Sequence, residues 1–199
     1  MFSKNNIQVV TPGQFSCLNQ DMYALGNVEL LNSKCIAVAG SRKIDSASSE
    51  WLKKSISKLH SDYTVVSGLA LGTDAIAHKS AINNNLPTIA VLPSGIGNIT
   101  PKSNIKIAKQ IIQENGLLLS EYPFRTGIKS NKQYIDRNKI IIDISNSLLV
   151  PQFDIKSGTR HTVDFAQEAQ KTIYIQDANY TGNQYIINND SYKTFILKW

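Results

Sequence analysis

Long apolar runs are missing from this chain of 199 residues, which contains no stretch approaching eighteen consecutive hydrophobic residues. The sequence therefore predicts no transmembrane helix and no membrane partner. The first fifteen residues contain no apolar segment of the kind found in secretory signals, so we expect a cytoplasmic protein. Cysteine is also scarce: Cys17 and Cys35 form neither a CxxC pair nor part of a histidine cluster. This pattern argues against a disulfide framework or a metal site, and Cys35 is expected in the core.

Signatures of common enzyme classes are absent too. The sequence has no GxGxxG fingerprint, which disfavours a nicotinamide-dependent oxidoreductase. It has no nucleophile elbow, no Walker lysine and no spacing of metal ligands. Glu121, at the end of an expected strand, would make a base but has no obvious catalytic partner. We therefore predict a protein that is not an enzyme and requires no cofactor.

Six short apolar runs recur along the chain, and each is nearly continuous in apolar residues, as expected of strands buried on both faces. The runs are 35–40, 63–68, 87–93, 116–122, 147–152 and 171–176. Polar segments with apolar residues at helical spacing separate them, such as Trp51, Leu52 and Ile56 before the second run. This alternation predicts an α/β fold: a Rossmann-like, doubly wound, mostly parallel sheet with helices on both faces.

The chain shows no internal repeat and no flexible linker, so a single domain is expected. Residues 1–34 are less regular and are predicted to form an N-terminal extension packed on the core. Residues 35–199 are predicted to form the Rossmann-like domain. The polar, asparagine-rich tail 177–199 is compatible with either a small appendage or a terminal strand.

The charge balance is basic, with 21 Lys and Arg against 15 Asp and Glu and a formal net charge of +6. Such a surplus favours a polyanionic partner. Many small soluble proteins are mildly basic, however, so the positions of the charges matter more than their sum.

Three sequence motifs fall at the carboxyl ends of expected strands, where open α/β sheets bind ligands. The first is "AGSRK" (39–43). Gly40 allows a tight exit from the strand, Ser41 is suited to cap a helix or donate to an anion, and Arg42 supplies a cation. The alternative is a plain turn with a solvated Arg42.

The second motif is "VVSGLALGTDAIAH" (65–78), an apolar strand followed by a turn of small residues and the start of a helix. Gly68 and Gly72 permit positive φ angles or close approach to a ligand, and Ser67 adds a hydroxyl. These features predict an anion-binding turn. Asp74 is expected either to cap the following helix or to hold Arg42, and His78 to be a packing or surface residue.

The third motif is a basic loop and helix, "SEYPFRTGIKSNKQYIDRNKIIIDIS" (120–145). Its cations, among them Lys132 and Arg137, alternate with aromatic residues such as Tyr134. Cations neutralise phosphates while rings stack on unpaired bases, so the pattern is typical of single-stranded nucleic-acid sites. The alternative is a solvated loop whose aromatics join the core. After the fifth run, Ser157 and Gly158 of "KSGT" are candidates for another anion-binding turn.

Taken in order, these motifs resemble the DNA-processing protein A (DprA/Smf) family over nearly the whole chain. The matching segments are 23–42, 65–78, 88–104, 117–124, 134–159 and "TGN" at 181–183. The resemblance implies a Rossmann-like core that binds single-stranded DNA, forms a homodimer and helps load a RecA-type recombinase, in natural transformation or recombination. It implies that Arg42 contacts DNA and that Tyr134 stacks on a base. It further implies that Ser67, Gly68 and Gly72 bind phosphate beside the pair Arg137 and Asn138.

Some features depart from the family pattern. Family members often carry flanking domains, and we expect this chain to be a shortened relative that corresponds to the core alone. A shortened relative would serve a mobile element or another role outside transformation. Arg160 and His161 are unusual after "SGT" and would alter the pocket.

Two other functions remain open. A small-nucleotide sensor or a phosphoribohydrolase-like enzyme would use the same kind of pocket, but the latter carries a "PGGxGT" turn with a nearby Glu. This chain has "LPSGIGNIT" (92–100) without that acidic partner. The other alternative is a dimeric scaffold with a vestigial pocket.

Overall fold

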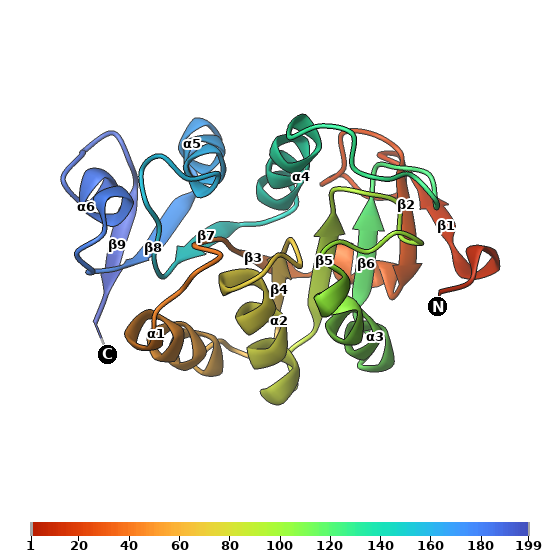
Figure 1. Cartoon of the computed structure of the whole chain (residues 1–199), viewed down its shortest axis with the longest axis horizontal. Helices are drawn as coiled ribbons and strands as arrows, with labels where there is room; N and C mark the ends of the chain where they lie inside the picture. Colours follow the sequence, from red (N-terminus) through yellow and green to blue (C-terminus); the bar gives the residue numbers. More distant parts are fainter. Residues whose placement is uncertain (1, 199) are drawn as a thin grey trace.

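A computed structural model describes residues 2–198, which form one nine-stranded sheet covered by helices on both faces (Figure 1). The strands are β1 (Gln8–Val10), β2 (Met22–Gly26), β3 (Lys34–Val38), β4 (Tyr63–Ser67), β5 (Thr88–Leu92), β6 (Leu117–Ser120), β7 (Ser147–Val150), β8 (Thr172–Gln176) and β9 (Thr194–Leu197). Their order across the sheet is β1-β2-β6-β5-β4-β3-β7-β8-β9. All six predicted runs form strands.

Six α-helices connect these strands within the described residues. They are α1 (Ser46–Ser57), α2 (Thr73–Asn83), α3 (Ile105–Gln113), α4 (Lys132–Asp143), α5 (Thr159–Glu168) and α6 (Thr181–Ile187), with short 3₁₀ helices at Lys4–Asn6, Val28–Asn32 and Lys102–Asn104. Helices α1, α2 and α3 lie on one face of the sheet, and α4, α5 and α6 lie on the other (Figure 1). The predicted doubly wound α/β fold is confirmed.

Strands β3 to β9 run parallel, and the direction of winding reverses at β3. Ala37 in β3 lies opposite Val66 in β4 on one side and Leu148 in β7 on the other. The chain thus winds outward from β3 in both directions. The edge of the sheet beyond the carboxyl ends of these central strands is where ligands bind in folds of this type.

The segments at both ends of the chain extend the same sheet. β2 pairs antiparallel with β6, and β1 pairs antiparallel with β2, so residues 1–34 supply two strands. Val10 and Met22 from this segment are each 1% exposed and belong to the main hydrophobic cluster. In the tail, α6 is followed by β9, which pairs parallel with β8 at the other edge.

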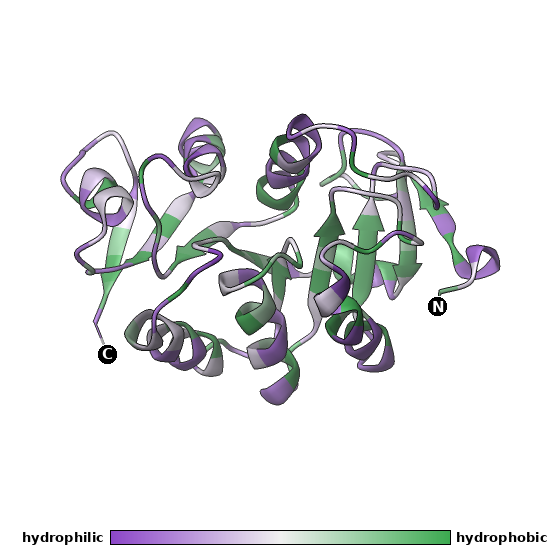
Figure 2. Cartoon of the chain, in the orientation of Figure 1, coloured by the Kyte–Doolittle hydropathy of each residue, from purple (hydrophilic) through white to green (hydrophobic). Residues whose placement is uncertain are grey.

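Apolar side chains from each strand alternate between the two faces of the sheet. Val65 packs with Trp51 and Leu52 under α1 and α2, whereas Val66 packs with Ile141 and other apolar residues under α4 and α5. Figure 2 shows the resulting hydrophobic strands in the middle layer and hydrophilic residues on the outer sides of the helices. The two faces of one sheet therefore share the core.

Among residues 2–198, no helix combines the length and apolar character needed to cross a membrane. Cys35 is fully buried, so its predicted place in the core is confirmed, and both cysteines are free thiols.

Candidate functional site

A pocket of about 90 Å³ opens near the carboxyl ends of β4 and β5. Its lining residues are Arg42, Gly68, Ala70, Leu71, Pro93, Thr100, Pro101, Tyr134 and Arg137. Arg42 comes from the first predicted motif, Gly68 from the second, and Tyr134 and Arg137 from the third. The fold therefore brings together three motifs that lie far apart in the sequence.

Arg137 forms the buried wall of this pocket and is 4% exposed. Its Nη1 donates to the carbonyl oxygens of Gly68 and of Val91, the latter at 3.2 Å, and lies 4.0 Å from Asp74 Oδ2. Burial lowers the pKa of Arg137, while the Asp74 carboxylate opposes that shift. The buried Nε has no hydrogen-bond partner among residues 2–198. Arg137 therefore retains an unused N–H donor in its buried environment beside the pocket.

Gly68 makes room for this arginine. A Cβ added at Gly68 would overlap Nη1 and would lie only 2.7 Å from Nη2 of Arg137. The sequence predicted a glycine that lets backbone approach a ligand. In the structure, the group that approaches the backbone so closely is the guanidinium of the protein itself.

Gly72 joins the second motif to the first. Its φ is +70°, and an added Cβ would lie 2.6 Å from the carbonyl oxygen of Ser41. The same Ser41 oxygen accepts from the Thr73 amide at 3.1 Å and from Thr73 Oγ1 at 2.9 Å. These contacts fix the 69–72 turn against the segment that carries Arg42.

Asp74 stabilises the 69–72 turn. Its Oδ2 accepts from the Ala70 amide at 3.1 Å and pairs with Arg137. Burial raises the pKa of Asp74, and the positive charge of Arg137 opposes this shift. From the sequence, Asp74 was expected either to cap the helix or to pair with Arg42. In the structure it instead accepts a hydrogen bond from the Ala70 amide of the turn and pairs with Arg137.

His78 lies in the core beneath this pair, fully buried. Its Nδ1 lies 2.8 Å from Thr88 Oγ1, and the Thr88 hydroxyl donates to the Val65 carbonyl at 2.7 Å. Because that hydroxyl proton is already used, Nδ1 must be the donor. Burial, reinforced by the charge of Arg137, lowers the pKa of His78 to about 3. His78 is therefore a neutral packing residue, one of the two alternatives that the sequence left open.

Arg42 and Tyr134 stand side by side at the rim. The guanidinium carbon of Arg42 lies 5.5 Å from the centre of the Tyr134 ring, within cation–π range. Arg42 is exposed and Tyr134 is half-buried. The rim thus presents an accessible cation beside an aromatic ring.

Three predicted residues support the pocket without lining it. Ser67 is fully buried, and its hydroxyl donates to the Val38 carbonyl at 2.8 Å. A Cβ added at Gly40 would lie 2.6 Å from Thr73 Oγ1, and the Ser41 hydroxyl donates to the Lys43 carbonyl at 3.0 Å. The contacts of these three residues therefore stabilise the turns that follow β3 and β4.

Four further predicted residues lie outside the pocket lining. Lys132 is exposed on α4 and pairs with Asp136 at 2.7 Å. Asn138 follows Arg137 on α4 and is half-buried. Ser157 and Gly158 precede α5, and Gly158 is exposed, with nothing within 4 Å of an added Cβ.

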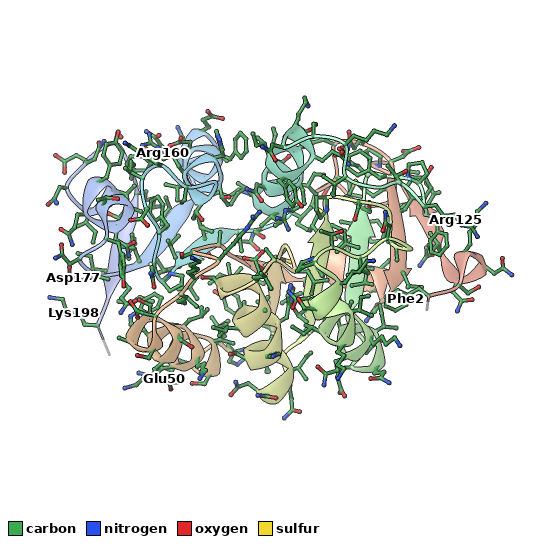
Figure 3. All side chains as sticks on the ribbon, in the orientation of Figure 1. Phe2, Glu50, Arg125, Arg160, Asp177 and Lys198 are labelled. Carbon is green, nitrogen blue, oxygen red and sulfur yellow. The ribbon has the colours of Figure 1, made fainter. Side chains whose placement is uncertain are left out.

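Arg160 has a structural partner instead of a place in the pocket. Its Nε donates to Asp164 at 2.6 Å, and its guanidinium lies 4.6 Å from the centre of the Tyr185 ring. Figure 3 labels Arg160 beside α5, on the side towards α6. It therefore links α5 to α6, while its neighbour His161 is exposed.

Gln152 and the apolar walls of the pocket were not predicted from the sequence. The Gln152 carbonyl accepts from the Ser41 amide at 2.8 Å, and its Oε1 accepts from the Asp45 amide at 3.0 Å. A polar side chain that ends an apolar run was the available signal. Pro93 and Pro101, which flank "SGIGNIT", form walls of the pocket.

Comparison with known proteins identifies the family of the chain. The family model for DNA recombination-mediator protein A matches residues 16–194. This chain belongs to that family. Protein Smf of Synechocystis is 36% identical over 159 residues, which cover 77% of this chain and 39% of that protein. DNA processing protein DprA of Streptococcus pneumoniae is 32% identical over 154 residues, covering 77% and 54%. The chain thus spans only about half or less of these curated relatives.

Two solved structures share the fold closely. One is DNA processing protein A of Helicobacter pylori, described for its unique single-stranded DNA binding mode, with a TM-score of 0.83 and 26% identity; the match covers 94% of this chain and 90% of that one. The other is DprA of Streptococcus pneumoniae, with a TM-score of 0.85 and 25% identity, covering 95% and 71%.

Proposed function

We propose that this chain binds single-stranded DNA at the pocket rim. The observation that carries the proposal is the placement of exposed Arg42 beside Tyr134, above a wall that contains buried Arg137. A guanidinium neutralises a phosphate, and an aromatic ring stacks on a base that is not already paired. Arg137, which lines the pocket, adds positive charge to its wall.

The size of the pocket favours a strand over a small nucleotide. At about 90 Å³ it is well below the roughly 300 Å³ or more of sites that enclose a small ligand. A hydrolase acting on a nucleotide would require a carboxylate in the pocket, and none of the described residues that line it carries one. A strand that crosses the rim and inserts one group fits these dimensions better.

The relatives support a wider role for the chain. The matching family is described as recombination-mediator proteins, and one structural relative is described by its single-stranded DNA binding. We extend the proposal accordingly: the chain acts as a homodimer, without catalysing a reaction, and helps a RecA-type recombinase onto the strand in natural transformation or recombination.

A titration of ligands against the full chain tests the central claim. Fluorescence anisotropy would compare an oligothymidylate, a duplex of equal length and a panel of nucleotides at one salt concentration. The oligothymidylate should bind most tightly. Binding of a nucleotide without binding of DNA would overturn the proposal in favour of a sensor.

Tyr134→Ala tests the stacking step. Stacking contributes roughly 1–3 kcal/mol per base, so the variant should bind oligothymidylate about tenfold more weakly. Tyr134→Phe keeps the ring and should retain the affinity of the original protein. An unchanged affinity in Tyr134→Ala would mean that the ring serves only packing.

A further inference from the structure

The surface charge is divided unequally between the two helical layers. Helices α1, α2 and α3, with the 3₁₀ turn before α3, carry six exposed lysines against a single exposed carboxylate, Glu50. These lysines are Lys53, Lys54, Lys79, Lys102, Lys106 and Lys109. On α4 and α5, by contrast, Lys132, Lys139 and Arg160 each pair with a carboxylate four residues later. Among the six helices, the basic surplus therefore lies on the α1–α3 side.

A furrow between α1 and α2 lies within this basic layer and has a volume of about 770 Å³. Lys53 and Lys54 of α1 and Lys79 of α2 line it. Of these three lysines, only Lys53 has an ion pair within residues 2–198, with Glu50 at 2.6 Å. Figure 3 shows Glu50 on the outer side of α1, away from the sheet. Two lysines are thus left to attract an anionic ligand.

Glu50, the partner of Lys53, and the hydroxyls of Ser57 and Ser80 also line the furrow, and the rest of the lining is apolar or carries carboxamides. Trp51 and Ile76 contribute apolar surface. Asn83, Asn84 and Gln176 contribute carboxamide groups, and Gln176 Oε1 is buried without a hydrogen-bond partner among residues 2–198. A carboxamide offers both a donor and an acceptor, as a peptide unit does. Phosphate oxygens, in contrast, only accept.

We propose that this furrow docks an acidic, partly apolar peptide segment of a partner protein. Carboxylates of the segment would meet the lysines, its apolar side chains would lie against Ile76, and its backbone would pair with the carboxamides. The furrow offers neither an arginine nor an exposed aromatic ring, which single-stranded nucleic-acid sites favour.

The dimensions also fit a single peptide segment. Packed helix axes lie about 8–10 Å apart, so a groove over the contact of two helices is about as wide as one extended chain. Helix α1 has 12 residues and is about 18 Å long, the span of roughly five or six extended residues. None of the furrow residues lines the pocket of Arg42 and Tyr134, so DNA and peptide would bind separately.

A matched pair of charge variants tests the proposal. The probe is a fluorescein-labelled peptide of about ten residues, long enough to span the furrow, made of aspartate and glutamate with two leucines. Replacing Lys53, Lys54 and Lys79 with Glu should weaken its binding to the full chain at least about tenfold. The same change at Lys102, Lys106 and Lys109 alters the net charge equally but lies outside the furrow. It should weaken binding less than about threefold at 0.15 M salt.

A steric variant separates shape from charge. Ala47 is exposed and lines the furrow, so Ala47→Trp would fill it without changing any charge. This variant should lose the peptide and keep oligothymidylate binding. Melting temperatures verify folding, and Lys→Gln changes replace the Glu changes if the latter destabilise the chain.

Three outcomes would overturn the proposal. Equal losses in the two charge variants would mean diffuse electrostatic attraction to the whole layer. Normal peptide binding by Ala47→Trp would mean that the furrow stays empty. Weaker oligothymidylate binding by Ala47→Trp, with displacement of the peptide by DNA, would mean that the furrow belongs to the nucleic acid.

Discussion

Gly68→Ala tests the packing of the buried arginine. The φ angle of Gly68 is not in the left-handed region, so alanine suits the backbone itself. The added Cβ, however, would overlap Nη1 of Arg137 and lie 2.7 Å from Nη2, so the guanidinium would have to leave its position. The substitution therefore displaces the charged end of the Arg137 side chain, whose backbone belongs to α4.

The cost follows from the contacts that Arg137 would lose. Its hydrogen bonds to the Gly68 and Val91 carbonyls each contribute about 1.5–3 kcal/mol because the donor is charged, which sets a loss of about 3–6 kcal/mol. Asp74 would also lose its buried counter-ion. For a chain of 199 residues, a loss of this size lowers the melting temperature by about 10–20 °C.

Thermal unfolding followed by circular dichroism measures this effect, and Gly158→Ala is the matched control. Gly158 has φ −61°, and nothing lies within 4 Å of its added Cβ, so its melting temperature should stay within about 3 °C of the original. Equal melting temperatures for the two variants would refute the assignment of Arg137 to the space above Gly68.

Two further predictions concern the pocket and its support. Arg42→Ala should cost about 2–3 kcal/mol of single-stranded DNA binding because it removes a charge-assisted contact, whereas Lys53→Ala at the same salt should barely register; equal losses would point to diffuse attraction. The pKa of His78 is about 3 in the folded protein and 6.5 in the unfolded chain, so on acidification the unfolded chain binds a proton at His78 before the folded protein does. Stability should therefore fall as the pH drops from 6.5 towards 3, by about 1.4 kcal/mol per unit from this group. Urea unfolding at pH 7 and pH 5 should show that the free energy of unfolding changes less with pH in His78→Gln than in the original protein. An equal change in both proteins would contradict the assignment of His78 as a buried neutral residue.

Hydrophobic patterning was sufficient to predict the central part of the fold. Each of the six apolar runs is a strand covered on both faces, which leaves a continuous signal in the sequence. The strands at the sheet edges left a weaker signal. β1 has only three residues, and in β9 two adjacent apolar residues, Phe195 and Ile196, are exposed. Such strands depend on pairing with a neighbour that lies far away in the sequence.

The site was predicted at the level of motifs but not of individual side chains. The three motifs meet because parallel strands end at one edge of the sheet. Which side chain of α4 turns inward depends on the helical face. Gln133, Arg137 and Ile141 share the buried face at four-residue spacing, whereas Lys132 lies on the exposed side. Reading that spacing backward from Ile141 would have marked Arg137 as buried.

The arrangement of the strands separates the two ends of the chain. β1 is one edge of the sheet and β9 is the other, and Figure 1 shows the termini at opposite ends of the molecule. Eight inter-strand spacings of about 4.8 Å place these edges roughly 40 Å apart, whereas the termini of many domains lie close together. A short linker between the two ends would not reach, so circular permutation would require a long one. Fusion partners attached at the two ends would face away from each other, with the pocket near the middle between them.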